Sequence, residues 1–238
     1  MSLLTIVQQA CRSPGIGLPA PTAVATSSDE SILQFLTVAN EEGQELSRRT
    51  PAWTALQVEA TFTTLATVSQ GSMATIAPNC NYIINDTIWD RDLRRPVFGP
   101  LTPQFWQQQV SQLMTGPWSQ FRVQRGLLEF YPAPTAGHTC AFEYITKAWC
   151  TDFTGATEKT LFSADDDVSL LDEYLMQLGV VWRWKQGKGL DYAEDYAKYE
   201  RAVTDAMGRD GSKPILNLGQ VRYDIYPGIL VPSGSWPV

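Results

Sequence analysis

The apolar residues of this chain change their spacing twice, and this change constrains the fold more than any other feature. Apolar side chains recur at three- and four-residue steps in residues 2–12 and 27–50, a pattern typical of amphipathic helices. From Leu56 to Thr63 apolar and polar residues alternate, which predicts a half-buried strand. Helical spacing returns after residue 165. Strands grouped between helical ends predict an α+β fold and argue against a parallel α/β sheet.

Further elements are expected in the middle of the chain. Residues 64–76 are predicted to continue as a second strand after a turn at Ser69-Gln-Gly-Ser72, and residues 96–98 as a short extended piece. Thr102 followed by Pro103 predicts the start of a helix. Residues 121–131 read as a hairpin that turns at Arg125-Gly126, and residues 139–146 as a strand with Phe142 and Tyr144 on one face.

Two helices are predicted between residues 165 and 208, separated by a break at residues 185–189. Asp165-Asp166-Asp167 is expected to cap the first of them, although three acids could also hold Mg²⁺. On the second helix Tyr192, Tyr196 and Tyr199 form a stripe, which either packs in the core or forms a subunit interface. Trp182 and Trp184 cannot share a helix face, so one of them is expected to meet a neighbour. The candidate subunit-interface residues are therefore Trp184, Tyr192, Tyr196 and Tyr199.

The segment after Gly211 contains four prolines and is nevertheless rich in apolar residues. A solvated tail is normally poor in such residues, because it cannot offset its ordering entropy by burial. We therefore expect this segment to bind another surface, which points to assembly rather than chemistry. Its candidate anchors are Ile215, Leu218, Val221, Tyr223, Ile225, Tyr226, Ile229 and Leu230.

Composition restricts the partners and cofactors. The formal net charge is −7, which disfavours sustained contact with a phosphate backbone. The charged share is 18%, while aromatic residues are abundant, as in proteins that cover much of their surface with neighbours or that have an aromatic core. The four cysteines lack metal-ligand spacing and are expected to be free core thiols, so neither a metal nor a cofactor is predicted. We expect no signal peptide and no membrane span.

The candidates for chemistry are few. His138 is the only histidine, and it lies in a predicted loop, where an exposed polar residue is unremarkable. Asp86, Asp90 and Asp92 surround Trp89, and carboxylates beside an aromatic residue could indicate glycan hydrolysis. The neighbouring Arg91, Arg94 and Arg95 favour local ion pairing instead. We therefore predict no catalytic residues, with a carboxylate-dependent glycan hydrolase as the alternative.

Four runs in the same order resemble one known family. They are Asp86-Thr-Ile-Trp-Asp-Arg91, Pro96-Val-Phe-Gly-Pro100, Phe130-Tyr-Pro-Ala-Pro-Thr-Ala-Gly137 with Phe142-Glu-Tyr144, and Leu170-Leu-Asp-Glu173 through Trp182-Arg-Trp-Lys-Gln-Gly-Lys-Gly-Leu-Asp-Tyr-Ala-Glu-Asp195. The chain is similar over about two-thirds of its length to head-to-tail adaptor proteins of tailed bacteriophages, the group that includes tail tubular proteins A.

The resemblance implies a structural virion protein in the neck between capsid and tail, assembled in the host cytoplasm. Its expected partners are the portal protein, a tail nozzle or other tail protein, further copies of itself in a dodecameric ring, and passing DNA bound without sequence specificity. The implied fold is a helical bundle formed by residues 1–52 and 161–211, a central antiparallel β-rich domain in residues 53–160 with one inserted helix, and an extended C-terminal arm in residues 212–238.

Overall fold

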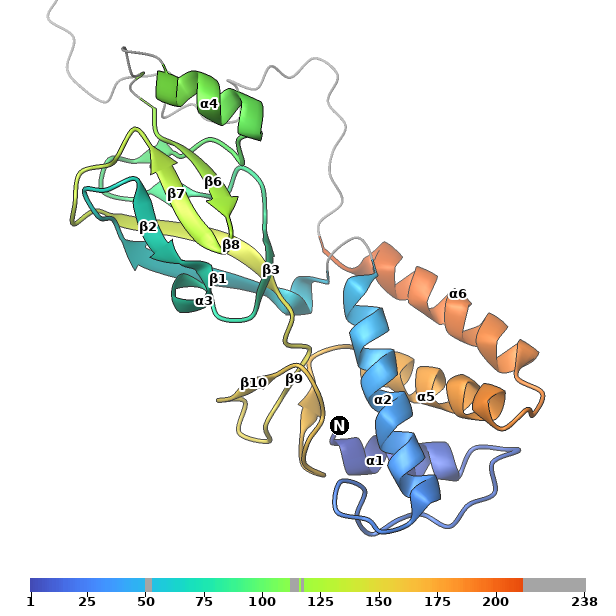
Figure 1. The fold of residues 1–238 in the computed structure, drawn as a ribbon. Helices are drawn as coiled ribbons and strands as arrows, with labels where there is room; N and C mark the ends of the chain where they lie inside the picture. The colour runs from blue at the N-terminus through green and yellow to red at the C-terminus, as the bar shows by residue number, and fades with distance from the viewer. Residues whose placement is uncertain (50–52, 112–115, 117, 212–238) are drawn as a thin grey trace, which may run out of the picture.

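The computed structural model describes residues 1–49, 53–111, 116 and 118–211, and within them the fold is mixed α+β (Figure 1). The helices are α1 (Leu3–Cys11), α2 (Glu30–Arg48), α3 (Met73–Ile76), α4 (Pro103–Ser111), α5 (Glu173–Gly187) and α6 (Ala193–Arg209), with a 3₁₀ turn η1 (Thr54–Leu56). The strands are β1 (Gln57–Thr63), β2 (Ser69–Ser72), β3 (Cys80–Ile83), β4 (Trp89–Asp90), β5 (Arg95–Pro96), β6 (Gln120–Gln124), β7 (Leu127–Tyr131), β8 (Thr139–Thr146), β9 (Cys150–Thr151), β10 (Glu158–Lys159) and β11 (Val168–Ser169).

Helices α1 and α2 confirm the predicted N-terminal helices. The apolar face of α1 is fully buried through Leu3, Ile6, Val7 and Ala10. Asp29 caps α2, because its Oδ1 accepts a hydrogen bond from the Ser31 amide at 2.9 Å. The hydroxyl of Ser27 in turn accepts a hydrogen bond from the amide of Asp29.

The central strands form two facing sheets. One has the order β1-β8-β4-β5, with β3 also paired to β8, and the other has the order β2-β7-β6. All of these pairings are antiparallel, as predicted. The hairpin β6–β7 turns at Arg125 and Gly126, whose φ angles of 51° and 74° are those of a tight two-residue turn. Strand β8 buries Phe142 and Tyr144 on the face that packs between the sheets.

The prediction for residues 64–76 is wrong. The expected turn Ser69-Gln-Gly-Ser72 is strand β2 itself, paired with β7, and the following residues form the short helix α3. The turn lies earlier, at residues 65–68, because the Gln70 side chain folds back on it. Its Oε1 accepts a hydrogen bond from the Leu65 amide at 2.8 Å, and its Nε2 donates to the Leu65 carbonyl at 3.1 Å.

The predicted start of α5 is also wrong. This helix begins at Glu173, where Asp172 accepts hydrogen bonds from the amides of Tyr174 and Leu175. Residues 165–171 form a loop and strand β11, which pairs with β9 in a third small sheet, β10-β9-β11. The predicted break after α5 is confirmed, since the helix ends at Gly187 and α6 follows from Ala193.

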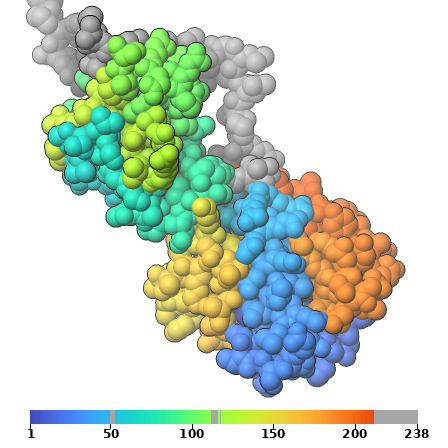
Figure 2. All heavy atoms as spheres, viewed as in Figure 1, coloured from blue at the N-terminus to red at the C-terminus, as the bar shows by residue number. Residues whose placement is uncertain are grey.

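Two clusters of buried residues lie in two lobes. One cluster joins α1, α2, α5 and α6 with the segment around Trp149, and the other fills the space between the two larger sheets. Figure 2 shows the N-terminal residues packed against the C-terminal helices in one lobe, with the middle of the sequence in the other. Among the described residues, no helix is long and apolar enough to cross a membrane.

Candidate functional site

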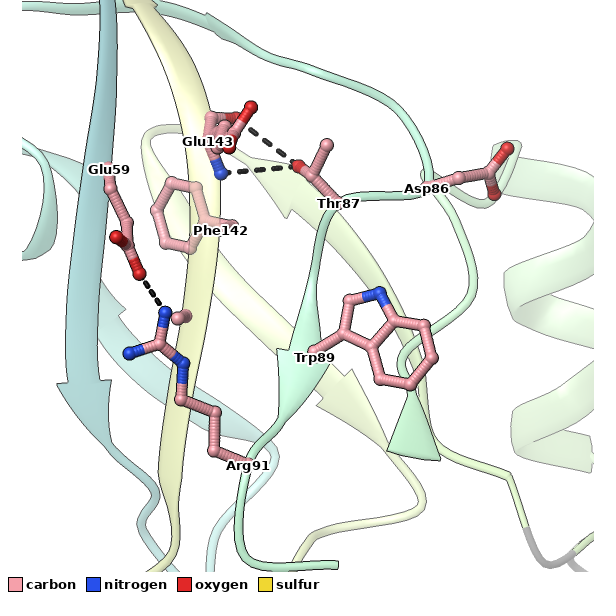
Figure 3. A pocket seen from close by; sticks show the side chains of 8 residues that line it. Glu59, Asp86, Thr87, Trp89, Arg91, Phe142 and Glu143 are labelled. Carbon is pink, nitrogen blue, oxygen red and sulfur yellow. Dashed lines mark hydrogen bonds and ion pairs between the residues drawn. The ribbon is translucent and has the colours of Figure 1, made fainter. Parts of the chain in front are cut away.

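A hollow of about 450 Å³ opens on the outer face of the sheet formed by β1, β8 and β4 (Figure 3). Glu59 of β1 and Glu143 of β8 are direct cross-strand partners there. Arg91 forms an ion pair with Glu59, and the hydroxyl of Thr87 accepts a hydrogen bond from the Glu143 amide at 3.2 Å. Trp89 lies beside them (Figure 3). In this hollow the acid- and aromatic-rich run of residues 86–92 meets the glutamates of β1 and β8.

The three aspartates of that run do not act together. Asp86 lines the hollow. Asp90 is buried, and its Oδ1 instead accepts hydrogen bonds from the amides of Asp92 and Leu93 at 3.0 and 2.9 Å. Asp92 accepts a hydrogen bond from the Thr139 amide at 2.5 Å. Asp90 and Asp92 thus hold backbone amides, and of these three aspartates only Asp86 lines the hollow.

Two smaller predictions about this region are corrected. Arg91 pairs with Glu59 on another strand rather than with a neighbouring aspartate. The guanidinium of Arg95 lies over the ring of Trp118 at 5.6 Å. His138, expected to be an exposed loop residue, is only 21% exposed, and its Nδ1 lies 3.0 Å from Asp90 Oδ2. Sequence reasoning missed these partners because the three contacts join segments that are distant in the sequence.

An aromatic cluster joins α5 to α6. The ring of Trp182 lies 5.0 Å from that of Tyr196, 5.8 Å from that of Tyr199 and 6.4 Å from that of Tyr192. Tyr199 is fully buried, whereas Tyr192 and Tyr196 are 36% and 41% exposed. The stripe therefore packs on its own chain and still presents two tyrosine edges at the surface.

The tryptophans of α5 both lie inside. Trp184 is 8% exposed and stacks on Phe35 of α2 with 5.1 Å between ring centroids, and Trp182 is equally buried. The expectation that one of the two meets a neighbour is therefore not met by the fold of the single chain. Of the four candidate interface residues, Tyr192 and Tyr196 are the two with substantial exposed surface.

A buried carboxylate connects α2, α5 and α6. Glu42 is fully buried, and its carboxylate accepts hydrogen bonds from Tyr199 Oη at 2.5 Å and from Arg183 Nε at 2.6 Å. Burial raises the pKa of Glu42, and the bonds from Tyr199 and Arg183 offset only part of that rise. Arg183 also pairs with Glu45 at 2.7 Å. Glu42 occupies a position on the apolar face of α2, three residues after Ala39 and four before Leu46. This spacing could have identified Glu42 as a buried residue from the sequence.

A second ion pair fastens the same helices. Arg49 donates two hydrogen bonds to Glu200, at 3.0 and 2.7 Å, and its guanidinium lies 5.4 Å from the ring centroid of Tyr199. The bond from Arg49 lowers the pKa of Glu200. The bidentate geometry fixes the end of α2 against the middle of α6.

The acidic triplet at residues 165–167 holds loops and does not cap a helix. Asp165 accepts hydrogen bonds from the amides of Val24 and Ala25 at 2.9 and 2.7 Å. Asp167 is buried and accepts hydrogen bonds from the Ser163 amide at 2.7 Å and from Lys159 Nζ at 2.6 Å. Burial by itself would raise the pKa of Asp167, but these bonds lower it below its ordinary value. No cluster of three metal-ligating side chains occurs among the residues that the structure describes.

The cysteines behave as predicted. All four are free, and Cys11, Cys140 and Cys150 are buried. Burial raises the pKa of Cys140 and of Cys150 to about 12, which keeps both thiols protonated and unreactive near neutral pH.

The predicted binding segment, from Ile215 to Leu230, lies outside the described residues, so its contacts are not part of this geometry. The structure gives its point of departure. Asp210, just after α6, accepts hydrogen bonds from the Thr54 amide at 2.8 Å and from Thr54 Oγ1 at 2.5 Å. The last described residues therefore lie beside η1, just before β1.

The sequence matches the model of a known protein family. The model of the family described as SU10 adaptor protein matches residues 1–220, which is most of the chain and extends beyond the end of α6. No curated protein matches the sequence. The match confirms the resemblance to head-to-tail adaptors of tailed bacteriophages. This chain belongs to the SU10 adaptor protein family of phage adaptors.

Proposed function

We propose that this protein is a structural component of the phage neck that docks on the portal protein, connects it to the tail and forms part of the DNA channel. The observation that carries the proposal is the family match over residues 1–220, because adaptors join a portal to tail components. Under this proposal copies of the chain form a ring, with a tail nozzle or another tail protein on the distal side and DNA passing through the centre. No step requires a catalytic residue.

The proposed domains follow the two clusters of buried residues. Residues 1–52 and 161–211 would form the helical body, residues 53–160 the β-rich domain and residues 212–238 the arm. In support, the helical cluster is cross-linked by Arg183–Glu42 and Arg49–Glu200, so it is held together without the arm. The arm can then serve the portal without being needed for folding.

The arm is proposed to carry most of the portal-binding free energy through a few anchors. Val221, Tyr223 and Ile225 alternate with Arg222 and Asp224, so in extended conformation the apolar side chains point to one side. Such a segment suits strand addition or an apolar groove, where aromatic anchors typically cost about 2 kcal/mol or more on truncation. Tyr192 and Tyr196, whose edges are exposed beside Trp182, are the proposed contribution of the helices to contacts between subunits.

The channel lining is proposed to be polar and net acidic. DNA must pass without adhering, and the charge of −7 per chain, repeated around a ring, gives a repulsive surface that is screened within about 8–10 Å at physiological salt. A band of lysine and arginine along the bore of the assembled ring would contradict this part of the proposal.

The portal contact is tested by co-sedimentation of purified portal with the full chain and with a chain truncated before residue 214. We expect the truncated protein to remain folded and to lose portal binding. The double variant Tyr223→Ala/Ile225→Ala is expected to reproduce most of the loss, by roughly 4 kcal/mol if the two anchors act independently. The matched control Arg222→Ala/Asp224→Ala changes the opposite side of the same segment and should bind nearly normally. Undiminished binding by the truncated chain would move the contact to the helical body.

A further inference from the structure

An apolar groove of about 790 Å³ runs between the edges of the two larger sheets. One wall is β3, with Tyr82 and Ile83, and the other is β6, with Phe121 and Val123, while Leu101 lies between them. Tyr82 is 47% and Val123 43% exposed, although both are large apolar side chains. None of the residues that line the groove is charged.

The β6 wall also presents backbone hydrogen-bonding groups. Phe121 directs its N–H to the Phe98 carbonyl at 2.8 Å and accepts a hydrogen bond from the Leu101 amide at 2.9 Å, both on the side away from β7. Val123 lies two residues further along the same strand, so its N–H and carbonyl point to that side as well. The chain that covers Phe121 continues into α4 at Pro103, and no backbone group among the described residues pairs with Val123 on that side of β6.

The C-terminal segment departs close to this groove. Asp210 is fixed to Thr54, three residues before Gln57 of β1. Gln57 is paired with Ile145 of β8, and Ile145 is paired on its other side with Tyr82 of β3. The path from Thr54 to Tyr82 therefore needs at most roughly 20 Å, made of the three residues of η1, counted at full extension, and two strand spacings. The stretch from Gly211 to Val221 can span roughly 33 Å when extended.

We propose that in the free protein the C-terminal segment occupies this groove, with residues 221–225 added as a strand along the Val123 edge of β6. Its alternation matches the site, because Val221, Tyr223 and Ile225 would face the uncharged groove while Arg222 and Asp224 face water. The groove thereby shelters the apolar side of the segment before a partner is bound. This inference concerns the unassembled chain and does not rest on the portal contact proposed above.

The test is hydrogen exchange on the full-length protein and on the chain truncated after Lys213, each at low and high protein concentration. In the full-length chain we expect the Val123 amide and residues 221–225 to be protected, and truncation to accelerate Val123 exchange by about tenfold or more. Amides of α5 serve as the internal reference and should not change. If Val123 exchanges equally fast in both chains, the proposal is overturned. Protection that appears only at high concentration also overturns it, because the segment would then come from a second copy.

Groove variants provide a second measurement. Tyr82→Lys in the full-length chain places a charge in the groove and should release residues 221–225 to the exchange rates of a free peptide of the same sequence. Val110→Lys is the matched control, since Val110 on α4 is exposed to a similar extent, 47%, but does not line the groove. Equal protection of residues 221–225 in both variants would count against the groove. Portal co-sedimentation is scored separately, so failure of one proposal does not imply failure of the other.

Discussion

Removing Arg183 should be the most damaging single change to the helical lobe. The Arg183→Met variant keeps most of the side-chain volume but removes the guanidinium that neutralises Glu42. Glu42 is fully buried and the Arg183 side chain is only 13% exposed, so little solvent screens the pair. Loss of one partner of a buried ion pair typically costs about 3–5 kcal/mol, because the remaining charge is left without compensation. For a chain of this size that corresponds to a melting-temperature decrease of roughly 6–20 °C.

The stability loss caused by Arg183→Met should depend on pH, and the titration of Glu42 determines the direction of that dependence. Burial already raises the pKa of Glu42, and removing Arg183 takes away one of the interactions that lowers it, so the pKa rises further in the variant. A carboxyl group whose folded-state pKa is raised destabilises the fold above that pKa and ceases to do so as the pH falls below its unfolded value. The difference between wild type and Arg183→Met is therefore expected to be large at neutral pH and to shrink as Glu42 becomes protonated.

The assay is urea denaturation followed by tryptophan fluorescence, across a pH series. Glu45→Gln is the matched control, because Glu45 pairs with the same arginine at 2.7 Å but is 55% exposed, so its loss should cost about 0–1 kcal/mol. A loss below about 1 kcal/mol for Arg183→Met, or a loss independent of pH, would show that solvent already compensates Glu42. The double variant Glu42→Leu/Arg183→Met should recover part of the stability, since it leaves no buried charge.

Two further substitutions test close packing and the loop carboxylate. Gly179→Ala should destabilise by about 1–3 kcal/mol despite the better helix propensity of alanine, because the added methyl group would overlap the Glu42 side chain. Gly208→Ala is the control, since nothing lies near that position, and it should be neutral or stabilising. Thermal melting of both variants measures the difference. Asp167→Asn should cost about 2–4 kcal/mol at neutral pH, whereas Asp166→Asn, at an exposed position, should cost little. The hydrogen bonds to Asp167 hold its pKa below the ordinary value, so its contribution to the free energy of unfolding should be present above the ordinary carboxyl pKa. That contribution should disappear as the pH falls through the lowered pKa of Asp167. A stability deficit of Asp167→Asn that persists unchanged in acid would refute this account.

Elements specified by neighbouring residues were predictable. The β6–β7 hairpin was predictable, because its Arg125-Gly126 turn lies between two strands with alternating apolar residues and needs no distant partner. Helix α1 was predictable because its apolar positions all lie on one face. In both cases the local pattern and the tertiary packing favour the same structure.

Elements specified by distant residues were not predictable. Asp165 resembles a helix cap until its actual donors, Val24 and Ala25, are seen on a segment far away in the sequence. The turn before β2 depends on the side chain of Gln70, for which no local pattern exists. The apolar groove could not be foreseen either, because its two walls belong to separate sheets whose packing the sequence does not give.

Several aspartates of this acidic chain stabilise its loops and turns through hydrogen bonds to the backbone. Long connections leave backbone amides that helices and sheets do not satisfy, and an aspartate side chain is the acceptor that reaches them most readily. Asp90, Asp152, Asp165, Asp167 and Asp172 each accept at least two backbone amides or an amide and a side chain. These five aspartates therefore stabilise loops and turns, and we propose that the chain binds its partners through the exposed tyrosine edges and the C-terminal segment, which in the free protein fills the apolar groove.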